Sequence, residues 1–170
     1  MRGPMRSVRF VFAVLVVLAA AGPALAQPLP NFSGTWVEDE SARKTTWPTQ
    51  PSGASKAMTL PPADTVVSQT AATLTTERKF MSQVLRYVYQ LDGKESVNHN
   101  GANTLTTKST WEGQKLVTRG TSFSVTSAGE SLWEFEEMRW LDKTGAMVTE
   151  TTNKDEGGKV NVVMQVYRKK

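Results

Sequence analysis

The chain has 170 residues, of which 20 are basic and 16 acidic, with a formal charge of +4 and no cysteine. A chain of this length suits one domain whose core needs no disulfide to hold it. The absence of cysteine excludes disulfides, thiolate metal sites and a lipid-anchored cysteine.

The first 26 residues have the pattern of a secretory signal peptide. Three arginines precede an apolar run over residues 10–21, and an Ala-Leu-Ala sequence ending at Ala26 offers small residues where a signal peptidase reads them. The run of twelve apolar residues is too short to span a bilayer comfortably. We therefore expect cleavage between Ala26 and Gln27 and a soluble mature protein in the periplasm or outside the cell.

Cleavage would also change the charge of the protein. Three of the basic residues and none of the acidic ones precede residue 27, so the formal charge falls from +4 to +1. A nearly neutral surface gives no electrostatic reason to bind nucleic acid, whose phosphates require a basic face. We expect residues 27–170 to form a single domain without a nucleic-acid partner.

The mature chain begins with a short aromatic strand, Phe32-Ser33-Gly34-Thr35-Trp36. Gly34 allows a backbone or a large ring to come close, and Trp36 adds a large apolar surface with one N–H to satisfy. This pattern suits one end of a barrel, and it equally suits a core tryptophan at the start of a β-sandwich.

A proline-rich segment follows at 38–63, with four prolines and no usable apolar period. Proline removes backbone donors and interrupts both helices and strands. We expect a long loop or lid across a barrel mouth, with Trp47 and Met58 as its large apolar side chains.

From residue 64 onward the apolar period is two, which predicts strands. The expected strands cover 65–69, 73–77, 84–91, 94–98, 104–111, 114–119, 132–141, 146–152 and 160–168. Asp92-Gly93 and Glu112-Gly113 are predicted to close tight hairpins. A bulge at Glu136-Glu137 is expected to place Trp133, Phe135, Met138 and Trp140 on one face.

Short strands in hairpin order, with no convincing helix, predict an all-β protein. We expect an antiparallel up-and-down β-barrel of about 8–10 strands, because closure removes the exposed edges that a sandwich would leave. A barrel of about eight strands either fills with side chains or holds one small ligand. An outer-membrane barrel is disfavoured, because Lys108 and Arg119 interrupt the apolar band that lipid would require.

Gly34-x-Trp36 resembles the first strand of the lipocalins and the fatty-acid-binding proteins, both of the calycin group. Together with the motifs at 91–96, 110–117 and 166–169, it resembles a group of exported bacterial lipocalin-like proteins of unassigned function. The resemblance implies a barrel closed at one end by Trp36, with Arg168 of the last strand across its ring. Fatty-acid-binding proteins hold a carboxylate with an arginine two residues before a tyrosine, where this chain has Gln165 before Tyr167.

The sequence offers no catalytic or metal-binding constellation. His99, the single imidazole, is expected in a surface loop without a second histidine. Glu134, Glu136 and Glu137 hold the carboxylates that a glycosidase pair would need, and the first two form the polar face of a strand. We therefore predict no enzyme activity, metal or cofactor.

The predicted function is binding or carrying a small apolar or amphipathic ligand inside the barrel. The candidate wall residues are Tyr87, Tyr89, Trp133, Phe135, Met138, Trp140 and Tyr167, with Arg86, Arg119 or Arg139 as a polar anchor if one faces inward. An aromatic row at strand spacing also suits an ordinary core. The alternative is therefore a closed-core module, without a ligand, that meets a protein or structural partner in the cell envelope.

Overall fold

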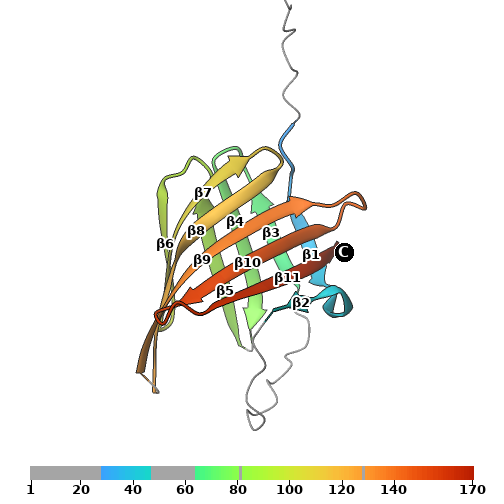
Figure 1. The fold of residues 1–170 in the computed structure, drawn as a ribbon. Helices are drawn as coiled ribbons and strands as arrows, with labels where there is room; N and C mark the ends of the chain where they lie inside the picture. The colour runs from blue at the N-terminus through green and yellow to red at the C-terminus, as the bar shows by residue number, and fades with distance from the viewer. Residues whose placement is uncertain (1–27, 47–63, 81, 128) are drawn as a thin grey trace, which may run out of the picture.

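The computed structural model describes residues 28–46, 64–80, 82–127 and 129–170, and shows one antiparallel sheet curled into a barrel (Figure 1). Its strands are β1 (Gly34–Glu38), β2 (Lys44–Thr45), β3 (Thr65–Gln69), β4 (Thr73–Phe80), β5 (Gln83–Gln90), β6 (Glu95–Asn100), β7 (Asn103–Glu112), β8 (Lys115–Thr126), β9 (Gly129–Leu141), β10 (Met147–Asp155) and β11 (Val160–Lys169), with a short 3-10 helix η1 (Glu40–Ala42). The predicted all-β, up-and-down fold is confirmed.

The order of the strands around the barrel is β5-β4-β3-β1-β11-β10-β9-β8-β7-β6, with β2 beside β11. The first and last strands are neighbours, and Glu38 lies opposite Tyr167. β5 and β6 lie at the two ends of this order, so no backbone ladder joins them in the described part of the chain. Gly93 makes the expected turn at a φ of 80°. The prediction of a tight hairpin there is nevertheless wrong, because the two strands form the two edges of the sheet.

Strand register determines which side chains face the interior. On β9, the residues that share the inward face with Met147 of β10 are Trp133, Phe135, Glu137 and Arg139, and those on the outer face are Glu134, Glu136, Met138 and Trp140. The ladder from β9 to β8 continues through Glu136 and Glu137 without an extra residue, so the predicted bulge is wrong. Met138 and Trp140 therefore lie outside the barrel, where the Lys115 ammonium lies 4.7 Å from the centre of the Trp140 ring.

One end of the barrel, which we call the closed end, is filled with apolar side chains. Its members are at most 2% exposed and comprise Phe32, Trp36, Val67, Leu74, Leu116 and Met147. The Phe32 ring stacks on Trp111 with centroids 5.8 Å apart, and the Trp36 indole N–H donates to the Phe32 carbonyl at 2.8 Å. Burying the large indole is stabilising because its single polar group has this partner.

The connection after β1 contains more structure than the loop predicted at 38–63. The chain turns through η1 and then rejoins the sheet as β2, where Thr45 lies opposite Val163 of β11. Trp47 and Met58, the expected lid residues, lie outside the described residues.

Gly120 allows β7 and β8 to approach each other closely. A Cβ atom at this position would collide with the carbonyl oxygen of Thr106, so the backbone of β7 would have to shift. Glycine inside a strand commonly marks such a close approach, which lets a sheet coil tightly. Gly120 lies opposite Phe135 on β9, so this close approach of the strands lies beside one of the candidate binding residues.

Candidate ligand-binding site inside the barrel

The structure divides the predicted site residues between the two faces of the wall. Those on the inward face are Tyr87, Tyr89, Trp133, Phe135, Arg139 and Tyr167, and those on the outer face are Arg86, Arg119, Met138 and Trp140. Of the three arginines proposed as a polar anchor, only Arg139 faces inward. The wall therefore draws on β5, β9 and β11, which the barrel brings around one interior.

Arg139 is the most deeply buried cation described. It is 7% exposed, and its Nη2 donates to Glu137 Oε1 at 2.7 Å. Its Nε and Nη1 atoms are buried and have no hydrogen-bond partner among the described residues. Burial opposes the charge and lowers the pKa of Arg139, but Glu137 and the nearby tyrosines more than offset this, and the pKa is raised overall. The guanidinium thus stays charged, with donors that no other described residue uses.

Arg78 supplies a second inward cation that the sequence did not predict. It lies on β4 opposite Thr65 and Leu85, on the same face as Tyr87 and Tyr89. Its Nε is buried without a hydrogen-bond partner in the described chain. The predicted strand ended at residue 77, whereas β4 continues to Phe80. The alternation of Leu74, Thr76 and Arg78, followed one step further, would have identified it.

The two inward carboxylates beside these groups, Glu38 and Glu137, each have a cation of their own. Glu38, whose side chain is 3% exposed, accepts from Arg43 Nε at 2.7 Å and from Gln165 Nε2 at 3.0 Å. Glu137 is paired with Arg139. Arg78 forms no ion pair among the described residues, so the interior carries an excess of positive charge. Gln165 stands two residues before Tyr167, where fatty-acid-binding proteins have the arginine that holds a carboxylate. In this chain its amide instead donates to Glu38.

Two buried phenols face the same charged groups. Burial raises the pKa of Tyr167 to about 12, and the negative charge of Glu38 adds to this shift. Burial likewise raises the pKa of Tyr89, with a further contribution from Glu137. Both side chains therefore stay protonated far above neutral pH and keep an O–H that can donate to an anion.

The other end of the barrel, which we call the open end, is lined differently. Its inward side chains are largely apolar but only partly buried, and they are Leu85, Tyr87, Leu105, Trp133, Phe135 and Val163. Since the strand ladders direct these side chains inward, their exposure means that solvent reaches this part of the interior. The polar groups around Arg139 therefore lie between a filled apolar end and a partly exposed apolar end.

A hollow lies on the outer face of the barrel. It has a volume of about 720 Å³ and is lined by residues of β7 to β10, among them Lys108, Arg119, Glu134 and Lys154. Arg119 is paired with Glu112 and Glu136, and Lys154 with Glu134. Because Arg119 and Lys154 already have carboxylate partners at the surface, each offers an anion a weaker anchor than Arg139 does.

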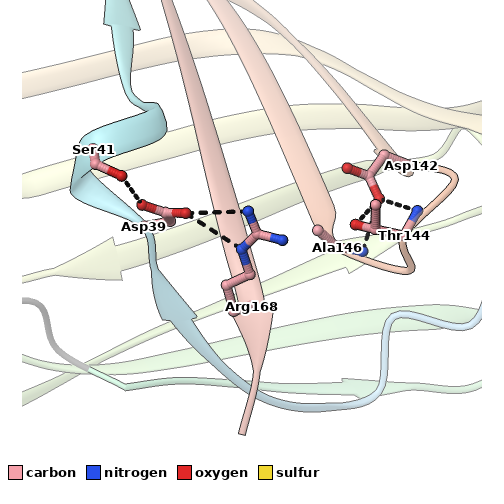
Figure 2. A network of polar contacts seen from close by, with 6 residues as sticks. All are labelled: Asp39, Ser41, Asp142, Thr144, Ala146 and Arg168. Atoms are coloured by element: carbon pink, nitrogen blue, oxygen red, sulfur yellow. Dashed lines mark hydrogen bonds and ion pairs between the residues drawn. The ribbon is translucent and has the colours of Figure 1, made fainter.

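The cation over Trp36 is Lys169 rather than Arg168. The Lys169 ammonium lies 5.6 Å from the centre of the Trp36 ring, and Gly34 leaves room for its side chain. Arg168 points outward and donates to Asp39 at 3.2 Å, as Figure 2 shows. A hydrogen bond from Ser41 and then the Arg168 guanidinium lower the pKa of Asp39. The expectation for Arg168 was wrong because it placed this residue on the inward face of β11.

His99 was predicted in a loop but lies on β6. It is exposed, and its Nδ1 is 3.1 Å from Thr104 Oγ1. Within the described ranges, no three His, Cys, Asp or Glu side chains gather where they could hold a metal ion. No helix among those residues is long and apolar enough to cross a membrane.

No protein-family model matches the chain, and neither does any curated protein. Among solved structures, a mutant of the REP1-NXSQ fatty acid transporter matches with a TM-score of 0.53 and 9% identity, over 81% of this chain and 97% of the other. The apo structure of lipid binding protein 8 from Caenorhabditis elegans matches with a TM-score of 0.50 and 12% identity, over 82% and 95%. This likeness establishes the fold alone: the chain forms a nearly closed antiparallel barrel of ten main strands, as do these two proteins.

Proposed function

We propose that this protein binds and carries an amphipathic small molecule whose anionic head lies beside Arg139 and Arg78. The observation that carries the proposal is Arg139, which faces the interior, is more than nine-tenths buried and charged, and has two donor atoms without a partner among the described residues. The fatty acid transporter and the lipid-binding protein of similar fold support a hydrophobic ligand, as their names indicate.

The energetics favour a ligand placed with its head inward. Buried donors that lack an acceptor are costly, and a hydrogen bond from a guanidinium to an anion is worth roughly 1.5–3 kcal/mol. The tail would then lie against Trp133, Phe135 and Leu105 at the open end, where each buried methylene contributes about 0.8 kcal/mol. A chain of several methylenes therefore adds more binding free energy than the head alone.

We further propose that the carrier works outside the cytoplasm, in the periplasm or the surrounding medium. The proposal rests on the arginine-led apolar run and the Ala-Leu-Ala sequence ending at Ala26. Fractionation of cells that produce the full chain, followed by sequencing of the mature N-terminus, tests it. A protein retained in the cytoplasm with its first 26 residues intact would overturn it.

The binding proposal is tested with two probes of equal length, dodecanoate and dodecanol, titrated against delipidated protein by calorimetry. We expect dodecanoate to bind more tightly than the alcohol. Arg139→Gln should weaken dodecanoate binding by about 10- to 100-fold and should change dodecanol binding little, since only the acid needs the charge. Arg119→Gln is the matched control, because that arginine lies on the neighbouring strand but faces outward, and it should leave both affinities unchanged.

Two results would overturn the proposal. One is equal weakening by Arg139→Gln and Arg119→Gln, which would place the head outside the barrel. The other is a folded protein that binds neither probe and retains no small molecule in native mass spectrometry. That second result would favour the closed-core envelope module instead.

A further inference from the structure

The boundary between β5 and β6, which we call the seam, is held by side chains instead of a backbone ladder. Three inward-facing residues of β6, namely Ser96, Asn98 and Asn100, reach across to the backbone of β5. Every other boundary around the barrel has a backbone ladder in the described residues. The seam is therefore the one boundary of the described barrel wall that is held by side chains without a backbone ladder.

The side-chain amides of Asn98 and Asn100 make the hydrogen bonds to β5 that the backbone of a neighbouring strand would otherwise make. Asn98 accepts from the Val88 N–H at 2.7 Å and donates to the Val88 carbonyl at 3.0 Å, so one amide satisfies both polar groups of one residue. Asn100 does the same for Arg86. These bonds satisfy the N–H and carbonyl groups of Arg86 and Val88 on the β5 edge, which helps the sheet to tolerate an open edge here.

Hydrogen bonds along the seam weaken toward the open end. Ser96 lies nearest the turn at Asp92-Gly93, is 8% exposed, and accepts from the Gln90 N–H at 2.8 Å. At the far end, Asn100 is less buried, and its bonds to Arg86 are 3.4 and 3.1 Å long. Longer and wetter hydrogen bonds are weaker, so the Asn100 end should separate first while the turn acts as a hinge.

We infer that the seam opens from its Asn100 end and is the route by which an apolar or amphipathic ligand passes through the side of the barrel. Behind this end lie Leu85 and Tyr87 of β5 and Leu105 of β7, which line the interior of the open end. On the outside, Val97 of β6 is 51% exposed beside the seam. An opened seam thus connects an apolar outer residue directly with the apolar interior. The inference rests on the proposed function.

The first experiment needs no ligand. Residue-level hydrogen exchange of the wild-type protein should show the Arg86 amide exchanging at least about tenfold faster than the Gln90 amide, with Val88 between them. Ser124→Ala is the control for losing a side-chain hydrogen bond elsewhere in the wall. It removes the bond to Ser131 across β8 and β9, a boundary that keeps its backbone ladder. It should leave this order unchanged. Equal protection of the three β5 amides would overturn opening of the seam.

The second experiment locks the seam. The protein has no cysteine of its own, so Arg86→Cys with His99→Cys can be joined specifically by a cleavable bismaleimide on the outer face. With anilinonaphthalenesulfonate as an anionic probe, we expect both association and dissociation to slow by about tenfold or more, with no change in Kd, because a route affects both rates equally. Cleavage of the linker should restore both rates. Lys108→Cys with Arg119→Cys, opposite each other across β7 and β8, is the matched control.

The outcomes separate the two proposals. Unchanged rates in the locked protein would show that the probe enters through the open end, which overturns the side route while leaving the binding proposal intact. Failure of the unlocked protein to bind the probe or dodecanoate would count against the proposed function and therefore also against ligand passage through the seam. Opening of the seam itself would still be decided by hydrogen exchange.

Discussion

The two ends of the barrel are built from the same strands in the same alternation, yet they differ in what faces inward. At the closed end, Trp36 and Leu116 are at most 2% exposed and pack into one apolar cluster. At the open end, Trp133 and Phe135 also face inward but stay partly exposed. Between them lie the charged groups around Arg139. The packing that stabilises the fold is therefore concentrated at the closed end, and the side chains of the open end contribute less to stability.

The largest test of this comparison replaces one tryptophan at each end. Trp36→Ala should lower the free energy of unfolding by about 3–5 kcal/mol, because it leaves a cavity in a filled cluster and orphans the Phe32 carbonyl. Trp133→Ala should cost about 1 kcal/mol or less, since its ring is already partly exposed. Urea denaturation of both variants measures the difference.

The same pair of variants should show the opposite order in binding. On the proposed function, Trp133→Ala weakens dodecanoate binding by removing part of the wall, whereas Trp36→Ala leaves the affinity of the folded fraction nearly unchanged. If both variants lost equal stability, the open end would be as tightly packed as the closed end, and the division between them would not hold.

The sequence predicted the wall of the barrel better than its interior. The strands and their outward or inward alternation follow from the period of two, so the placement of Leu85, Tyr87 and Tyr89 on one face of β5 is confirmed. The bulge on β9 was wrong because it assumed that four aromatic or sulfur-containing side chains must share one core. Trp140 instead packs outside under Lys115, where a cation covers its ring.

The pairing of the interior charges and the seam could not be predicted from local patterns. The alternation along β4 could have placed Arg78 on the inward face, but whether an acidic side chain lies beside it depends on how distant strands are arranged around the barrel. Asp92-Gly93 gives a turn in either case. Whether the strands beside it pair through backbone or through side chains depends on Asn98. In the sequence, Asn98 is only a polar residue in an alternating strand. Sequence alone does not distinguish an amide facing solvent from one bonded to a neighbouring strand.

An intermediate effect is expected from pH, because Tyr167 lies between the closed end and the charged groups. Its folded-state pKa of about 12 is above the unfolded value near 10, so the folded state binds the phenolic proton more tightly. This stability is fully present below about pH 10 and is lost as pH rises toward about 12, by roughly 2–3 kcal/mol in total. Denaturation midpoints measured across this range test it.

Tyr167→Phe provides the comparison, since it removes only this phenolic hydroxyl. The wild type should lose more stability than the variant between about pH 9 and pH 12. Tyr89 should behave in the same direction, because burial also raises its pKa. Parallel curves for the wild type and Tyr167→Phe would show that the Tyr167 phenol is as solvated in the folded state as in the unfolded one.

The smallest expected effect distinguishes the two basic residues near the end of β11. Lys169→Met removes the cation over the Trp36 ring and should cost about 0.5–1 kcal/mol, as exposed cation–π contacts do. Arg168→Met removes only an outward, solvent-screened pair with Asp39, so its denaturation midpoint should stay closer to that of the wild type. The two variants remove the same charge from adjacent positions, so a difference between them reports the ring contact and not net charge. A larger loss for Arg168→Met would mean that the ion pair between Arg168 and Asp39, more than the contact between Lys169 and the Trp36 ring, stabilises the closed end.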